Sequence, residues 1–320
     1  MSRLIRIGIA LAGVALAAAA HAQEYPTRPV RLLVGYPAGG GADGLARTVS
    51  ARLGDVLGQQ VIVDNRPGAG GTVAADALAK AAPDGHTLYF ADTAILIAPA
   101  VYARLTYDPV KSFAPVGNVC SLPLVFVANP ALPASSPPEL IALLKGNPGK
   151  YSYGSPGFGT VQHLAFELFK KQAGVDVVHI PYKGAAPIIP DLLSGQIPLA
   201  IISAAPAIAQ ARAGKLKAIA LSSPVTLAAA PDWPALAATL PGFDASPRLF
   251  ILAPAGTPQP VIARLSGTLR DVLALPEVNE SLSRQGATAE WSSPEALGRQ
   301  IAAETAKWGA IARDAGLKPE

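Results

Sequence analysis

The sequence predicts an α/β protein of two lobes, each a mostly parallel sheet flanked by helices. Two stretches of alternating strand-like and helix-like segments indicate this, one over residues 30–90 and one over residues 124–221. The third observation is a mainly helical tail up to Leu317, which has too few strand-like runs to form a domain of its own. We therefore expect the tail to return to the first lobe, so that the chain crosses between the lobes twice.

In the first stretch, the compact apolar run at residues 30–34 predicts a strand, and residues 42–57 predict a helix. The helix is indicated by Leu45, Val49 and Leu53, because steps of three and four residues place side chains on one face. Further strands are expected at residues 61–63 and 87–90, with a second helix between them that ends near Lys80. This order favours parallel strands with helices on both faces.

The second stretch repeats the alternation. Strands are expected at residues 124–127, 151–154, 177–180, 199–202 and 216–221, and helices from residue 139 and at 161–173, 185–193 and 206–213. One more strand is expected at 249–252, and Pro258 or Pro260 marks the start of a late helix, since proline suits a first helical turn. The predicted division is residues 23–122 with 246–320 as lobe 1, and residues 123–245 as lobe 2.

The N-terminus has the pattern of a secretory signal peptide. Arg3 and Arg6 precede an apolar run at residues 7–20, and Ala20-His21-Ala22 gives an A-x-A cleavage site. The alternative, a membrane anchor, needs about 20 apolar residues, and this run is too short. We expect cleavage after Ala22 and a periplasmic protein. The remaining 24 Lys and Arg face 22 Asp and Glu with no basic run, so no nucleic-acid partner is expected.

Few residues are arranged for catalysis, metal binding or a cofactor. Cys120 is the one cysteine, and its apolar neighbours predict a buried, inert thiol. The segment around Ser155 fails the G-x-S-x-G pattern because Tyr153 occupies the place of the first glycine. Gly39, Gly41 and Gly44 match a dinucleotide spacing, with Asp64 as the acid, but Tyr36-Pro37-Ala38 stands between the strand and Gly39. We expect no catalytic residue, no metal site and no cofactor.

Two glycine-rich turns, one in each stretch, lead directly into helices. Gly39-Gly40-Gly41 precedes the helix at 42–57, and residues 154–160 precede the helix at 161–173. A helix start presents free backbone N–H groups and the positive end of its dipole, which suits an anion. The pair therefore favours a main-chain clamp for a carboxylate. Thr160 could equally be a plain helix cap or a ligand contact.

Seven ordered blocks closely resemble the Bug-type receptors of tripartite tricarboxylate transporters. They are YPTRPVRLLVGYPAGGGADGLAR from Tyr25, GQQVIVDNRPGAGGTVAADALAKAAPDGHTL from Gly58, LTYDPVKSFAPV from Leu105, GKYSYGSPGFGTVQHLAFELFK from Gly149, VDVVHIPYKGAAPIIPDLLSGQI from Val175, GKLKAIA from Gly214 and LAPAGTP from Leu252. The resemblance covers almost the whole chain after the signal segment. It implies a two-lobed type II periplasmic-binding-protein fold that closes on its ligand.

The resemblance also implies which residues bind the ligand. Those carried over are Tyr36, Pro37, Ala38, Gly39, Gly40, Thr93, Ser155, Gly159, Thr160, His163, Tyr182 and Ser203. For His163 the alternative is packing or positioning, for Tyr182 it is hinge or core packing, and for Lys183 it is a solvated charge. Arg248 stands where relatives usually show an aromatic-x-glycine segment, and it is either a cationic contact in the cleft or a surface residue.

The resemblance implies a monomeric receptor, with no enzymatic activity, that hands a small mono- or dicarboxylate to membrane permease subunits. Two alternatives are a receptor that feeds a sensor kinase and a periplasmic hydrolase that uses Ser155. The departures around Arg248 leave the identity of the carboxylate open.

Overall fold

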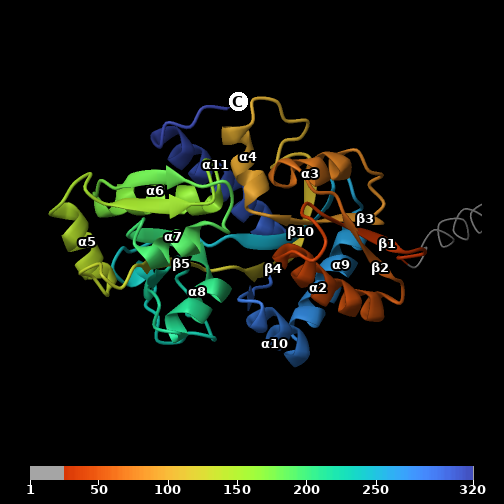
Figure 1. Cartoon of the computed structure of the whole chain (residues 1–320). Helices are drawn as coiled ribbons and strands as arrows, with labels where there is room; N and C mark the ends of the chain where they lie inside the picture. Colours follow the sequence, from red (N-terminus) through yellow and green to blue (C-terminus); the bar gives the residue numbers. More distant parts are fainter. Residues whose placement is uncertain (1–24, 320) are drawn as a thin grey trace, which may run out of the picture.

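The computed structural model describes residues 25–319, and it contains two β-sheets with helices packed around each (Figure 1). The expected signal peptide and its cleavage after Ala22 lie outside the described residues. The predicted fold class is confirmed: the strands form two separate α/β layers. Within residues 25–319, no helix combines the length and the apolar character that a bilayer crossing requires.

The larger sheet has the strand order β11-β4-β10-β3-β1-β2. Its strands are β1 (Val30–Val34), β2 (Val61–Asn65), β3 (Thr87–Asp92), β4 (Phe113–Ser121), β10 (Arg248–Pro254) and β11 (Thr288–Ala289). β1 pairs in parallel with β2 and β3, whereas β10 runs antiparallel to both β3 and β4. The expected parallel β-α-β unit is therefore present, and β10 returns from far along the chain to lie between β3 and β4.

The smaller sheet has the order β7-β6-β8-β5-β9. Its strands are β5 (Leu124–Ala128), β6 (Ser152–Ser155), β7 (Val178–Pro181), β8 (Leu199–Ser203) and β9 (Lys217–Leu221). β6 is parallel to β7 and β8, and β5 is antiparallel to β8 and β9. In each sheet the first strand after the chain has crossed from the other sheet, β10 or β5, is antiparallel to both of its neighbours.

Helices cover both sheets. They are α2 (Gly41–Leu57), α3 (Thr72–Ala79), α4 (Ala94–Val101), α5 (Pro137–Lys145), α6 (Val161–Ala173), α7 (Ile188–Ser194), α8 (Ala204–Arg212), α9 (Gln259–Leu273), α10 (Pro276–Arg284) and α11 (Pro294–Asp314). α2 and α9 bury their apolar stripes, which include Leu45 and Leu269, against the larger sheet. α11 contacts α4 beside the larger sheet and α6 beside the smaller one (Figure 1). Its buried Trp308 belongs to a core that both sheets share.

The two crossings between the sheets lie side by side and are bonded to each other. The Leu122 N–H donates to the Pro247 carbonyl at 2.8 Å, and the Leu124 N–H donates to the Ser222 hydroxyl at 2.9 Å. The Ser222 N–H returns a bond to the Leu124 carbonyl at 2.8 Å. These bonds give the two sheets a narrow, ordered connection.

The elements that were not predicted include α4 and β4. α4 is apolar all round and contains Pro99, so it shows no amphipathic stripe, and its residues Ile95 to Ala98 are buried. β4 contains Pro115 and Gly117, which are unfavourable in isolated strands, yet it pairs on both edges with β10 and β11. Tertiary packing overrides local preference in both. Cys120 lies in β4 and is fully buried, as predicted, and burial raises the pKa of its thiol.

Candidate functional site

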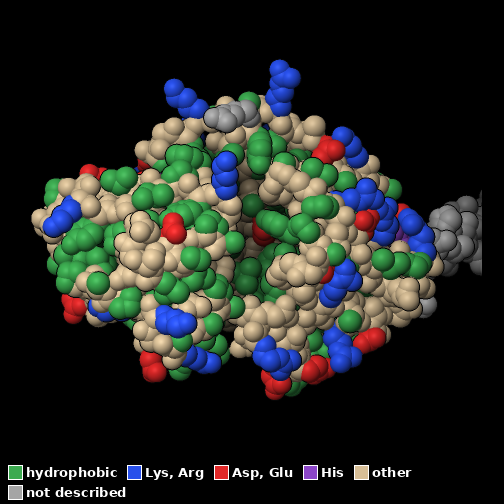
Figure 2. Space-filling model, in the orientation of Figure 1, with side chains coloured by type: hydrophobic (Ala, Val, Ile, Leu, Met, Phe, Trp, Pro, Cys, Tyr) green, Lys and Arg blue, Asp and Glu red, His purple; other side chains and the backbone are tan. Residues whose placement is uncertain are grey.

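A cleft of about 620 Å³ opens between the two sheets, at the ends of strands β1, β3, β6 and β8. Figure 2 shows it as a hollow in the middle of the face, with apolar side chains on its floor. Ligands of α/β proteins usually bind beyond the carboxyl ends of parallel strands, and this cleft occupies that position. Its polar lining includes Tyr36, Asp92, Thr160, Gln162 and Ser203, together with the backbone of Gly40, Gly41 and Gly159.

The first helix start in the cleft is that of α2. Gly40 is its N-cap residue and has no side chain to bond the first amides, so the N–H groups of the first turn are open to the cleft. Gly39 has φ +80°, a conformation that favours glycine. At its end, Gly40, the turn therefore presents main chain and no side chain to the cleft.

Asp43 holds this turn from behind. Its carboxylate accepts the Gly39 N–H and an Asn65 side-chain N–H, both at 2.9 Å, and pairs with Arg47 at 2.9 Å. The amide of Asn65 also donates to the Tyr36 carbonyl at 3.0 Å. The bond from Arg47, helped by that from Gly39, holds the pKa of Asp43 well below its usual range. Asp43 and Arg47 thus neutralise each other and fix the backbone of the turn.

The second helix start is that of α6, which belongs to the smaller sheet. The Thr160 hydroxyl accepts the His163 N–H at 3.2 Å and donates to the Gly157 carbonyl at 2.8 Å. Thr160 is thus a helix cap, although it also lines the cleft. The Gly159 N–H donates to Nδ1 of His163 at 3.2 Å. Val161 and Gln162, the first two residues of α6, line the cleft, and amides in a first helical turn have no partner within the helix.

The structure brings Gly40 and Thr160 to one cavity, from opposite sheets. Among the twelve residues predicted to bind the ligand, those that line the cleft are Tyr36, Pro37, Gly40, Gly159, Thr160 and Ser203. Ser203 is exposed and caps α8 without a side-chain bond to it. Ala38 and Gly39 are exposed in the same turn, but they do not line the cavity. Whether these residues contact a ligand stays a prediction.

The other predicted residues lie behind the lining. Ser155 is fully buried, and its hydroxyl is hydrogen bonded to Nε2 of His179 at 2.7 Å. The rings of His163 and His179 stack with centroids 4.0 Å apart, and burial lowers the pKa of each to about 4. Tyr182 donates to Asp191 at 2.7 Å. This cluster supports the glycine turn from inside the smaller sheet.

Thr93 is also buried, and its hydroxyl accepts the Arg248 N–H at 2.9 Å. Its neighbour Asp92, which was not predicted, lines the cleft. The Asp92 carboxylate accepts the Ala94 N–H at 2.8 Å and the Tyr36 hydroxyl at 2.5 Å. Burial raises its pKa, although both bonds act against the rise. An acid at the carboxyl end of a strand, where ligands of parallel sheets usually bind, is the signal that could have found it.

Arg248 does not line the cleft. Its guanidinium, 13% exposed, contacts Asp244 at 2.7 Å, Glu304 at 2.9 Å and Glu290 at 3.4 Å. The two alternatives considered, a cationic ligand contact and a solvated surface charge, are therefore both wrong. Arg248 instead ties the second crossing to α11.

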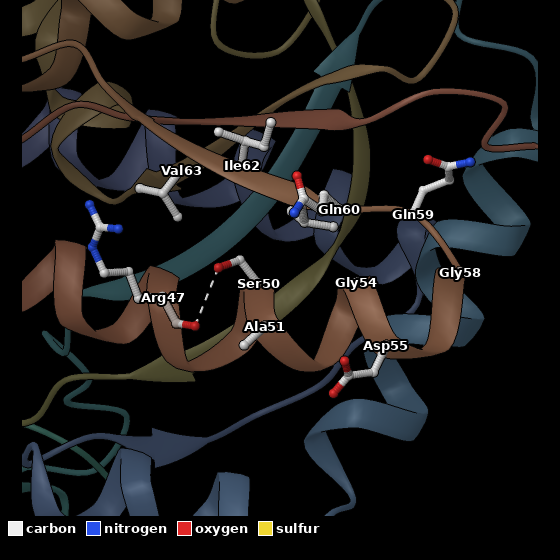
Figure 3. Close-up of a pocket in the computed structure, with 11 residues that line it drawn as sticks. Arg47, Ser50, Ala51, Gly54, Asp55, Gly58, Gln59, Gln60, Ile62 and Val63 are labelled. Carbon is white, nitrogen blue, oxygen red and sulfur yellow. Dashed lines mark hydrogen bonds between the residues drawn. The ribbon is translucent and has the colours of Figure 1, made fainter.

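A second hollow of about 630 Å³ lies on the outer side of the larger sheet, between α2 and the edge strand β2 (Figure 3). In it the Ser50 hydroxyl donates to the Arg47 carbonyl at 3.3 Å, so this polar group is already used within the helix. The hollow is open, and no helix start within residues 25–319 faces it. The cleft between the sheets is the stronger candidate because elements from both sheets converge there.

Comparison with known proteins gives a consistent result. Residues 45–317 match the family described as the tripartite tricarboxylate transporter family receptor. The chain is 35% identical to protein BugT of Bordetella pertussis over 322 residues, which covers 99% of each protein.

Two solved structures of Rhodopseudomonas palustris proteins are similar over nearly their whole length. One is Rpa4515 with adipate, with TM-score 0.76, 32% identity and coverage of 92% of this chain and 100% of that one. The other is MatC with bound malate, with TM-score 0.71, 30% identity and coverage of 90% and 100%. The resemblance to Bug-type receptors is thus confirmed.

Proposed function

The chain belongs to the tripartite tricarboxylate transporter receptor family, and on that premise we propose that it is a periplasmic receptor for a small mono- or dicarboxylate. The observation that carries the proposal is the pair of helix starts, α2 and α6, which open into one cleft from opposite sheets. Their free N–H groups and dipoles suit an anion. The adipate and malate held by the two similar proteins are of this chemical class.

The binding step we propose is closure of the two halves on the ligand. The moving units are residues 23–122 with 246–320, and residues 123–245, which meet at the bonded crossings around Leu122 and Ser222. Closure removes water from the cleft, and hydrogen bonds to the carboxylate strengthen as water leaves. A ligand stabilises the closed state only if it binds that state more tightly than the open one, which requires contacts with both halves. The start of α2 provides contacts from one half, and the start of α6 provides them from the other.

The output we propose is delivery of the acid by a monomeric receptor to membrane permease subunits, as the family name implies. A receptor that signals through a sensor kinase would use the same closure and differ in its partner. The two outputs can be distinguished by adding the ligand-loaded receptor to membranes that contain the permease subunits. Binding of the closed receptor to the permease would support transport.

The binding test is a thermal-shift and calorimetric series on the mature chain. Mono- and dicarboxylates from acetate to adipate and malate should raise the melting temperature, since a ligand of the folded state stabilises it. Neutral sugars of similar size should not. Stabilisation by sugars and by none of the acids would contradict the carboxylate proposal.

A hydrolase is the second candidate, because Ser155 and His179 are 2.7 Å apart, as in a nucleophile and base pair. Two observations weigh against it. Ser155 is fully buried behind the turn, and Nδ1 of His179 is buried with no partner in the described part of the chain, where a triad would place a carboxylate. Turnover of carboxylic esters that is lost in Ser155→Ala would reverse this preference.

A further inference from the structure

The cleft contains an acid where a carboxylate receptor would be expected to place a base. Among the described residues that line it, Asp92 is the one with a charged side chain, and none is Lys, Arg or His. Figure 2 likewise shows acidic atoms and no basic ones inside the hollow. An ionised carboxylate in a partly desolvated cavity is unfavourable unless a counter-ion meets it.

The partners of Asp92 within the protein are neutral. The phenol of Tyr36 bonds Oδ2 and the Ala94 N–H bonds Oδ1, so neither neutralises the charge. Each carboxylate oxygen can accept more than one hydrogen bond, so acceptor capacity is left on the side that faces the cavity. No salt bridge to Asp92 is formed within residues 25–319. Asp92 is therefore held in place by the Tyr36 hydroxyl and by the first N–H of α4, with no cationic side chain beside it among the described residues.

The cleft thus has two poles. The starts of α2 and α6 form one that favours an anion, and Asp92 forms one that favours a cation. Much of the remaining lining is apolar and includes Ile97, Val101 and Leu249. A ligand that matches all three carries a carboxylate, a short hydrocarbon body and a cationic nitrogen.

We propose that Asp92 binds an ammonium group of the ligand, so that this receptor selects amino-bearing carboxylic acids over the plain acids of the same skeleton. The inference rests on the proposed carboxylate receptor and narrows its ligand class. The Tyr36 hydroxyl and the Ala94 N–H act as positioning groups that orient the Asp92 carboxylate. A charged hydrogen bond to a desolvated partner corresponds to roughly a tenfold to hundredfold difference in affinity.

The test compares matched pairs of acids by calorimetry: L-aspartate with succinate, and 6-aminohexanoate with hexanoate. In the wild-type protein, the aminated member of at least one pair should bind at least about tenfold more tightly than its partner. Asp92→Asn keeps the size of the side chain and the acceptor for the Ala94 N–H, but removes the charge. It should weaken binding of the aminated acid by roughly tenfold to a hundredfold and leave the plain acid unchanged or tighter.

Asp232→Asn, an exposed site in a loop far along the chain, is the control for the same change in net charge and should preserve the preference. Equal or tighter binding of the plain acids by the wild type would overturn the inference while leaving the carboxylate proposal intact. So would an unchanged preference in Asp92→Asn. Binding of neither kind of acid by the wild type would overturn the carboxylate proposal itself, and this inference with it.

Discussion

Asp92 and Arg248 lie one residue apart across the β3–β10 pair, yet they meet opposite surroundings. Leu249 is the register partner of Asp92, and the Thr93 N–H donates to the Arg248 carbonyl at 3.1 Å. Arg248 turns away from the cleft and meets three carboxylates, whereas Asp92 faces the cleft and meets two neutral donors. The charge of Arg248 is thus neutralised by carboxylates of the protein, whereas we propose that the charge of Asp92 is neutralised by the ligand. Two of the four predictions below test this difference directly, and the other two test the groups that hold the start of α6.

Removal of Arg248 should have the largest effect on stability. Arg248→Met leaves Asp244, Glu290 and the buried Glu304 without their common cation, and breaking a buried ion pair on one side costs about 3–5 kcal/mol. Urea unfolding should show this loss, with a smaller loss for Arg248→Lys. Ligand affinity of the folded variant should change little. A variant as stable as the wild type would show that this cluster is not structural.

Acid should destabilise the half that contains His163 and His179. Burial lowers both pKa values to about 4 in the folded protein, whereas an unfolded imidazole titrates near 6.5. Between these values the unfolded chain binds more protons, so stability is complete above about pH 6.5 and falls as the pH drops toward 4.

For the well-buried His163 this amounts to about 3 kcal/mol, at about 1.4 kcal/mol per unit of pKa. Urea unfolding of wild type and His163→Gln at pH 7 and pH 4.5 checks it, because the variant should lose less stability on acidification. Equal losses of stability in the two proteins would show that acid destabilises the protein through groups other than His163.

A methyl group at Gly159 should disturb the second helix start. Gly159 has φ +71°, and a Cβ there would lie 2.7 Å from Cγ2 of Val101, which also lines the cleft. Gly159→Ala should lower the free energy of unfolding by about 1–3 kcal/mol and weaken carboxylate binding at least tenfold. Gly174→Ala is the matched control, since Gly174 has φ +63° at the far end of α6 with open space around it. It should lose stability and keep affinity.

The smallest effect, with the opposite sign, is expected at Asp92. Burial raises the pKa of Asp92, so its charge lowers stability at every pH at which the folded group is ionised. Asp92→Asn should therefore stabilise the ligand-free protein at pH 7, by roughly 0.5–1 kcal/mol, as substitutions at functional sites often do. Thermal unfolding without ligand measures the change. A destabilised variant would show that the charge of Asp92, like that of Arg248, contributes to the stability of the fold.

Much of the architecture could be predicted from local patterns. The strand at Val30–Val34 follows from a compact apolar run, and the helix that ends at Leu57 follows from periodicity. The two glycine turns mark the helix starts that line the cleft. β4 and α4 could not be predicted this way, because Pro115, Gly117 and Pro99 oppose the local preference. Pairing with β10 and burial against the core stabilise those elements, and both depend on residues far away in the chain.

By itself the sequence determined the alternation of strands and helices, the glycine turns and the family, because these depend on neighbouring residues and ordered motifs. Only the tertiary structure decided which charges are satisfied. Arg248 gains partners from residues 244, 290 and 304, and Asp92 turns toward a cavity whose other wall is built by residues 158–162. The physical reason is that the free energy of a charge depends on what surrounds it in space, and folding brings those groups together from distant positions.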